Sequence, residues 1–243
     1  LVPILPEPSS TDKNRYISFV VAPSSAGQET AIRVQLASLN HVCSSTSAAA
    51  NKTCASNANC PGGTCLVPFA GREGEYRYVN AILDGNNQPV FNCPDSQLLQ
   101  STFKCARLGC APEYRDWAAL TAGQALHVTG DSVVPSSIFR ISSLPQAACQ
   151  GNEALCLAAS AEVEGRTAQW GDVDGSLQVN VLDVSKLVDK VKDLATGTFI
   201  KPRTQMQPSV PSSLANTNVL DIANGVDALK SKTYPFSGPS ACP

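Results

Sequence analysis

The sequence predicts a mainly β protein, an antiparallel β-sandwich with disulfide-stapled loops, followed by a small α-helical domain. Three observations predict it. Over the first 170 residues, short stretches of alternating apolar and polar residues recur between Gly-, Pro- and Ser-rich turns. Ten cysteines fall in local clusters within these turns. The last third changes to helical spacing and contains an internal duplication.

The N-terminal segment, residues 1–12, is predicted to be extended, because three prolines in its first eight residues exclude a helix. Its apolar side chains have no local partner and are candidates for assembly: Leu1, Val2, Ile4 and Leu5. Such a segment can add a strand to the sheet of a neighbouring copy, or it can fold back on its own chain.

A sandwich is predicted over residues 13–170. Ile17, Phe19 and Val21 alternate with other residues in one strand, and Ile32, Val34 and Leu36 do so in the next. Further strands are expected at 76–83, 125–129, 137–142 and near 162–170. Short strands divided by turns, without helices, are typical of immunoglobulin-like or fibronectin type III-like sandwiches.

The cysteines indicate export. Two stretches, residues 44–64 and about 84–112, are predicted to be long surface loops that need disulfides to hold their shape. The disulfide candidates are Cys43, Cys54, Cys60, Cys65, Cys93, Cys105, Cys110, Cys149, Cys156 and Cys242. An even number in such sequence suits an oxidising compartment, so the protein is expected to be extracellular, with its signal peptide already removed.

Only one disulfide is predicted individually, between Cys149 and Cys156, which close a short loop; the other pairings stay open. The alternative is zinc, since Cys60 and Cys65, like Cys105 and Cys110, are separated by four residues. Paired CxxC knuckles and nearby histidines are missing, which argues against this alternative. The triplet beginning at Asn51 is a candidate N-glycosylation site.

Composition and motifs point away from several functions. A net charge of -2 with scattered basic residues predicts no nucleic-acid partner. No apolar run approaches the roughly 20 residues that span a bilayer. The chain contains no nucleophile elbow, phosphate loop or zincin motif, and of its two histidines His127 is expected on the surface of a strand. We therefore predict that the protein is not an enzyme.

The duplication lies in residues 171–243, where Asn-Val-Leu-Asp occurs at 180–183 and again at 218–221. Each copy continues with helical spacing. One expected face consists of Val184, Leu187, Val188 and Val191, and the other of Ile222, Val226 and Leu229. Two short antiparallel helices that bury these faces on each other are predicted.

The loop before the first of these helices is a candidate calcium site. Oxygen-bearing side chains recur along residues 172–183, and the candidate ligands are Asp172, Asp174, Ser176, Gln178, Asn180 and Asp183. Calcium takes six to eight oxygens at about 2.3–2.6 Å, and this spacing wraps them around one point. The alternative is an Asp-rich turn that caps the helix without a metal.

This duplicated loop-helix unit resembles a dockerin type I domain, the calcium-binding module of cellulosome proteins, over about residues 171–235. With the sandwich before it, the chain is similar to secreted proteins of environmental bacteria. The resemblance implies calcium and a cohesin partner. In one departure, Leu177 stands where such a loop has glycine. In another, the second copy places Val210, Ser212, Leu214, Asn216, Asn218 and Asp221 at the ligand positions, so one calcium is expected.

A third departure concerns the partner. Dockerins present small polar residues to cohesin where this chain has the apolar pairs Val181-Leu182 and Val219-Leu220. The leading prediction is therefore a non-catalytic extracellular structural protein that assembles head to tail, as a fibre or surface-layer subunit, through its N-terminal strand. The alternatives are a cellulosome-like adaptor that binds a cohesin, or a secreted carbohydrate-binding module in which Trp117 and Trp170 form the sugar platform.

Overall fold

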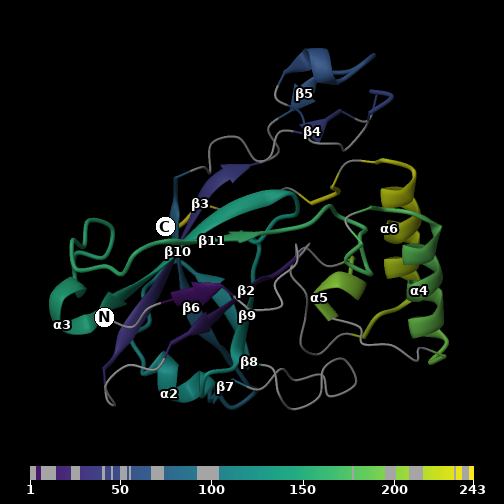
Figure 1. Ribbon diagram of the computed structural model, residues 1–243. Coiled ribbons are helices and arrows are strands. Elements are labelled where there is room, and N and C mark those ends of the chain that lie inside the picture. Colours follow the sequence, from purple (N-terminus) through teal and green to yellow (C-terminus); the bar gives the residue numbers. More distant parts are fainter. Residues whose placement is uncertain are drawn as a thin grey trace.

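The computed structural model describes residues 4–6, 15–22, 28–39, 42–44, 46–49, 54, 56–66, 74–91, 104–176, 178–194, 201–207, 216–232, 234–236 and 241–243. The fold is mainly β with few helices, as the sequence predicts. One large mixed sheet forms the body, a small disulfide-bonded finger projects from it, and a pair of helices lies at one end of the molecule (Figure 1).

Nine strands form the large sheet. They are β1 (Ile4–Pro6), β2 (Ile17–Val21), β3 (Thr30–Leu39), β6 (Tyr76–Leu83), β7 (Pro89–Val90), β8 (Lys104–Gly109), β9 (Ala125–Thr129), β10 (Ser137–Pro145) and β11 (Val163–Arg166). Their order is β1-β2-β9-β8-β6-β3-β10-β11, with β7 paired to β6. All pairs are antiparallel except β8 and β9, which are parallel, so the predicted purely antiparallel arrangement is wrong. Because these strands belong to one sheet, the predicted two-sheet sandwich is not confirmed.

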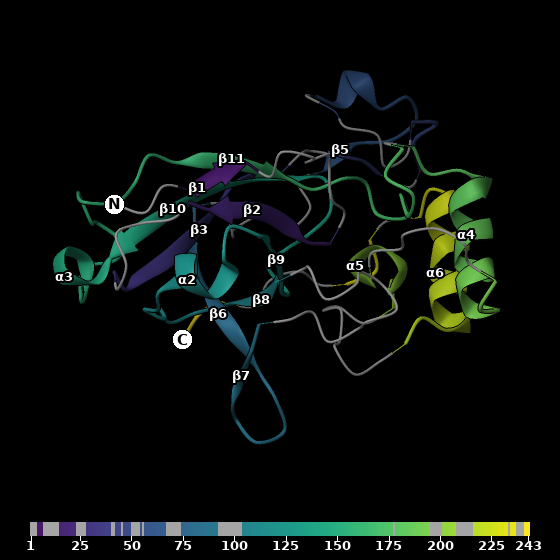
Figure 2. The same ribbon diagram turned by 60° about the horizontal axis from the view of Figure 1, so that its bottom comes forward.

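The sheet is nearly barrel-shaped. Its first strand, β1, contacts its last strand, β11, and the two lie side by side in Figure 2. At this seam Gly165 of β11 lies against β2, since a Cβ atom at Gly165 would sit 3.7 Å from the Cβ of Ile17. This is an ordinary van der Waals distance, so β11 and β2 are in direct contact at this position. The curled sheet encloses one interior.

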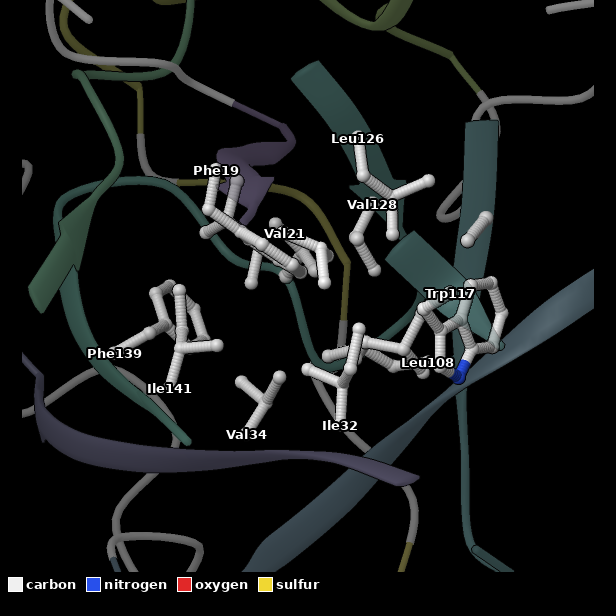
Figure 3. Close-up of a cluster of buried hydrophobic side chains, with 14 of the residues drawn as sticks. Phe19, Val21, Ile32, Val34, Leu108, Trp117, Leu126, Val128, Phe139 and Ile141 are labelled. Atoms are coloured by element: carbon white, nitrogen blue, oxygen red, sulfur yellow. The ribbon is translucent and has the colours of Figure 1, made fainter. Parts of the chain in front are cut away.

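Alternating residues of the strands fill this interior (Figure 3). The labelled side chains come from β2, β3, β8, β9, β10 and the short helix α2 (Trp117–Thr121): Phe19, Val21, Ile32, Val34, Leu108, Trp117, Leu126, Val128, Phe139 and Ile141. Burial of each such side chain is worth roughly 1.5–3 kcal/mol. The period-two pattern of the sequence therefore locates the core correctly, although it does not reveal the topology.

Strand β8 corrects the predicted surface loop at 84–112, because it lies inside the sheet between β6 and β9. Only Ala106 and Leu108 of its six residues are buried, and the strand also contains lysine, arginine and cysteine. In the sequence, two apolar residues among polar ones cannot be distinguished from a polar loop. The short helices α2 and α3 (Gln146–Cys149) lie within residues 13–170, where the sequence predicted no helices.

The finger contains the first cysteine cluster. Strands β4 (Val42–Cys43) and β5 (Cys65–Leu66) pair with each other, with the 3-10 helix η1 (Asn57–Asn59) between them. Two disulfides cross-link the finger internally, Cys43–Cys60 and Cys54–Cys65. The predicted disulfide-stapled loop is therefore confirmed here. Asn51 lies outside the described residues.

Two further disulfides join described residues. Cys149–Cys156 closes the short loop that the sequence predicted, and Cys110–Cys242 ties the end of the chain to the end of β8. Cys105 is disulfide-bonded as well, whereas Cys93 lies outside the described residues. Because the cysteines of both proposed zinc spacings are disulfide-bonded, the zinc alternative is wrong.

The helical unit consists of α4 (Val181–Val191) and α6 (Val219–Leu229), with the short α5 (Lys201–Thr204) between them in sequence. The two long helices are antiparallel, since Gly171, before α4, packs against Ala228 at the end of α6, and Leu187 packs on Gly225 at mid-length. Val191 and Leu229 were expected on the buried faces but are exposed, because they lie beyond this central contact. None of the described helices is long and apolar enough to span a bilayer.

Candidate calcium site

The site is built on the N-terminus of α4, where Asn180 and Asp183 form a capping box. The Asn180 side-chain oxygen accepts a hydrogen bond from the Leu182 amide at 2.7 Å, and Asp183 Oδ2 accepts one from the Asn180 amide at 2.8 Å. An Asn followed three residues later by an acid favours this arrangement, and the positive end of the helix stabilises the carboxylate. The helix start thus fixes the orientation of Asp183.

The other oxygen of Asp183 ties the loop to the helix. Oδ1 accepts hydrogen bonds from the amides of Val173 at 2.8 Å and Asp174 at 3.1 Å. Asp183 is fully buried. Burial raises its pKa above the ordinary value, although the amides of Asn180, Asp174 and Val173 oppose this shift. A cation nearby would favour the charged form of this carboxylate.

Asp172 and Asp174 complete a cluster of three carboxylates. Asp172 is fully buried, and its Oδ1 accepts from the amides of Gly175 at 2.8 Å and Ser176 at 3.0 Å. One oxygen from each of Asp172, Asp174 and Asp183 lies within 4.8 Å of the others. Three crowded, largely buried carboxylates repel one another, and oxygen donors of this kind fit a hard cation such as calcium.

The other three predicted ligands are placed differently. Ser176 and Gln178 are exposed, and the Ser176 hydroxyl donates to the Gln178 carbonyl at 3.3 Å. Asn180 uses its side-chain oxygen as the helix cap. The structure therefore brings together three of the six predicted residues, and Leu177 lies outside the described residues.

Two basic side chains, which the sequence did not single out, border the cluster. Lys186 Nζ lies 3.6 Å from Asp174 Oδ2. Burial alone would raise the pKa of Asp174, but hydrogen bonds from Ser176 and the charge of Lys186 hold it below its ordinary value. Arg203 of α5 is nearly buried and its guanidinium lies directly against Gly175, whose φ of 76° suits glycine.

The second copy repeats the helix start after a longer loop. Asp221 Oδ2 accepts from the Asn218 amide at 2.7 Å, and Asp221 Oδ1 accepts from the Gln207 amide at 2.9 Å. The equivalent bond in the first copy spans 10 residues, whereas this one spans 14, so the second loop is longer by four. Met206, not Val210 as the sequence spacing suggested, therefore corresponds to Asp172.

A buried arginine adjoins this second loop. Arg15, which precedes β2, is fully buried and donates a hydrogen bond to the Gln205 carbonyl oxygen. Its guanidinium lies over the Phe236 ring, 5.5 Å from the centroid. Burial lowers the pKa of Arg15, and Tyr234 and Asp221 oppose this shift. A methionine thioether and one carboxylate supply few of the oxygens that calcium takes, and the expectation of a single calcium stays a prediction.

Other candidates gain no support from the described residues. Trp117 and Trp170 are buried, with 0% and 5% exposure, and no described aromatic side chain is exposed, so a sugar platform is not present among them.

His127 is buried beside Tyr16, with 5.2 Å between ring centroids, and its predicted surface position is wrong because Tyr16 covers that face of β9. In the predicted assembly segment, Ile4–Pro6 pairs with β2 of its own chain.

No family model matches the chain, and neither curated proteins nor solved structures show a match to it.

Proposed function

We propose that this chain is a non-catalytic, extracellular structural protein that binds one calcium ion and assembles head to tail with copies of itself. Disulfides between described residues support an oxidising environment, because thiols stay reduced in most cytosols. The buried carboxylates of Asp172 and Asp183 support calcium. In this role calcium clamps the helical unit and takes no part in signalling.

The observation that carries the proposal is the position of β1. This strand is only three residues long, occupies an end of the sheet and pairs with β2 through Ile4–Val21, Leu5–Val20 and Pro6–Phe19. A strand of three residues makes few hydrogen bonds to its neighbour, and an identical strand from another copy can make the same bonds. Exchange of β1 between copies would join subunits in an open series, since donor and acceptor are different surfaces. The other two predicted assembly residues in this segment, Leu1 and Val2, lie outside the described residues.

Mixed cysteine variants test this exchange. Ile4→Cys and Val21→Cys are made in separate chains, mixed under assembly conditions and oxidised. Because the two positions are register partners, exchange predicts a cross-chain disulfide dimer on a non-reducing gel. Ile4→Cys mixed with Lys232→Cys, whose positions are not paired, is the matched control.

Negative-stain microscopy provides the second measurement. Wild-type protein is expected to form filaments, and a variant lacking residues 1–8 is expected to form none while it keeps its melting temperature within a few degrees. Absence of both filaments and the cross-chain dimer would mean that β1 only folds back on its own sheet, and self-assembly through the N-terminal strand would be rejected.

A cellulosome-like adaptor is the second candidate, and one observation favours it. The apolar pairs at the two helix starts, Val181-Leu182 and Val219-Leu220, are all exposed, where a dockerin presents its recognition residues. Pull-down with cohesin domains, compared with Leu182→Glu and Leu220→Glu variants, tests it. Retention of wild-type protein alone would support the adaptor.

A further inference from the structure

Two oppositely charged side chains from distant parts of the chain are buried where the sheet meets the helical unit. Arg15 stands just before β2, Asp221 lies in the first turn of α6, and the exposure of each is 0%. In both Figures 1 and 2, α5 lies between the sheet and the pair α4 and α6. Gln205, which accepts a hydrogen bond from Arg15, directly follows α5. Arg15 therefore links the sheet to the second loop of the helical unit.

The direct contacts of Arg15 satisfy its hydrogen bonds but do not balance its charge. Its Nη1 donates to the Gln205 carbonyl oxygen, its guanidinium lies over the Phe236 ring, and it forms a side-chain hydrogen bond with Tyr234. A carbonyl, an aromatic ring and a phenol are all uncharged. Burial lowers the pKa of the guanidinium, and Tyr234 and Asp221 act in the opposite direction. The carboxylate of Asp221 thus supplies the opposite charge that a buried cation needs.

Asp221 has the complementary need. Its two oxygens accept hydrogen bonds from the amides of Gln207 at 2.9 Å and Asn218 at 2.7 Å, and these donors carry no charge. Residues 205–207 therefore contact Arg15 through a carbonyl and Asp221 through an amide. Water screens charges weakly inside a protein, so an arginine and an aspartate joined through three residues attract each other strongly.

The first copy, by contrast, has a surplus of negative charge. One oxygen from each of Asp172, Asp174 and Asp183 lies within 4.8 Å of the others, and the cations that border them are Lys186 and Arg203. The Lys186 side chain is 45% exposed, so water screens its charge. The three carboxylates outnumber the two cations, and this surplus favours a cation from solution.

The second copy lacks this surplus at its helix start. Met206 stands at the position of Asp172, and Arg15 balances the charge of Asp221. The guanidinium is part of the same chain and is fully buried, so a change in the solution does not remove it. A duplicated unit thus has one half that depends on an external cation and one half that contains its own.

We propose that Arg15 is the internal cation of the second copy, and that calcium consequently controls only the first loop. Removal of calcium should loosen residues 172–183, while the second loop and the start of α6 stay fixed to the sheet. The contrast between the copies rests on the proposed calcium site. The pairing of Arg15 with Asp221 does not depend on it.

Hydrogen exchange of the full chain, followed by NMR with calcium or with EDTA, tests the contrast. The reporters are amides that bond the two aspartates: Val173 and Asn180 for Asp183, and Gln207 and Asn218 for Asp221. We expect EDTA to speed exchange at the first pair about tenfold or more, because calcium stabilises only the state that binds it. Exchange at the second pair should change by less than about threefold.

The variant R15M should reverse this pattern. With calcium present, exchange at Gln207 and Asn218 should be about tenfold faster or more, whereas Val173 should keep its wild-type rate. R33M is the matched control, because Arg33 is a nearly buried arginine of β3 and should leave exchange at both loops unchanged. The hydrogen-bond partners of Arg33 are Ser142, Glu153 and Ala154.

Thermal melts in two backgrounds isolate the charge. In wild type, R15M should lower the melting temperature by roughly 6–20 °C, because it leaves Asp221 buried without an opposite charge. In the D221N background that charge is absent, so the same substitution should cost less than half as much. If R15M does not fold alone, folded protein in the double variant R15M/D221N would support the pairing, and a double variant that is also unfolded would contradict it.

Three results would overturn the inference: equal losses of melting temperature in the two backgrounds, unchanged exchange at Gln207 and Asn218 in R15M, or exchange that rises equally in both loops when bound calcium is removed. A different result separates it from the proposed calcium role. If wild-type protein does not respond to calcium while R15M loosens the second loop, the calcium role is rejected and the pairing of Arg15 with Asp221 stands.

Discussion

Asp183→Ala tests the link between the carboxylate cluster and the stability of the helical unit. The substitution removes the acceptor of three amides, those of Val173, Asp174 and Asn180. A buried amide left without a partner costs about 1–3 kcal/mol, so we expect a loss of at least about 3 kcal/mol in the free energy of unfolding. Asp221→Ala is the internal control, because its carboxylate accepts from two amides, and about 2 kcal/mol is expected.

Calcium distinguishes the two variants more sharply than stability does. Wild-type protein with calcium at 100 times the dissociation constant should gain about 2.7 kcal/mol. For a chain of this size, about 2–4 °C of melting temperature accompanies each kcal/mol, so the expected rise is roughly 5–11 °C. Asp183→Ala should lose most of this rise. Asp221→Ala should keep it, because the second loop has Met206 where the first has Asp172.

The assay is differential scanning calorimetry on protein stripped with EDTA, with and without added calcium, supported by isothermal titration. Two results would refute the reasoning. One is a wild-type protein that shows neither heat of binding nor a rise in melting temperature. The other is an equal calcium response in the two variants, because the cluster at the first loop would then not be the site.

Three further predictions concern the framework. C110S/C242S opens a disulfide with a sequence separation of 132 and should lower the free energy of unfolding in urea by about 5 kcal/mol; a loss under 1 kcal/mol would contradict the chain-entropy argument. Gly171→Ala should lower the melting temperature more than Gly123→Ala, since both have positive φ but only Gly171 would overlap Ala228; equal losses would contradict this packing. Burial raises the pKa of Glu153, but hydrogen bonds from neighbouring amides and the Tyr114 hydroxyl outweigh this effect and hold the pKa below its ordinary value. The stability that Glu153 gives to the loop at residues 150–157 is therefore fully present above about pH 4.3 and is lost as pH falls through the lower pKa of the folded state. Amide NMR shifts of this loop should show the titration step in wild type and not in Glu153→Gln.

The sequence was most informative where a local pattern has one structural meaning. The alternations at β2 and β3 and the stretch that became β6 predicted strands correctly, because one face of each strand is buried. The pair Cys149–Cys156 was predicted because few residues separate the two thiols. The two helices were predicted from their apolar spacing, although the first loop was expected to run to Asp183 and α4 begins at Val181.

Features that depend on distant residues were not predictable. Strand β8 is identified by its neighbours β6 and β9, and its own six residues contain little signal. His127 is buried beside Tyr16, which is far away in sequence, so its burial could not be read from the local pattern. The alignment of the second loop with the first could not be read from residue spacing either, because the second loop is four residues longer. The hydrogen bond from the Gln207 amide to Asp221 shows which residues correspond.

The Cys110–Cys242 disulfide also determines how the molecule would carry mechanical load. The chain leaves the sheet after β11, passes through the helical unit and is covalently returned to the end of β8. Tension applied to the helices would reach the sheet by two covalent routes at once. Tension applied at Cys242 would pass directly to β8 and bypass the helices. While this bond is intact, the helical unit is therefore anchored covalently to the sheet on both sides, through the segment after β11 and through Cys242.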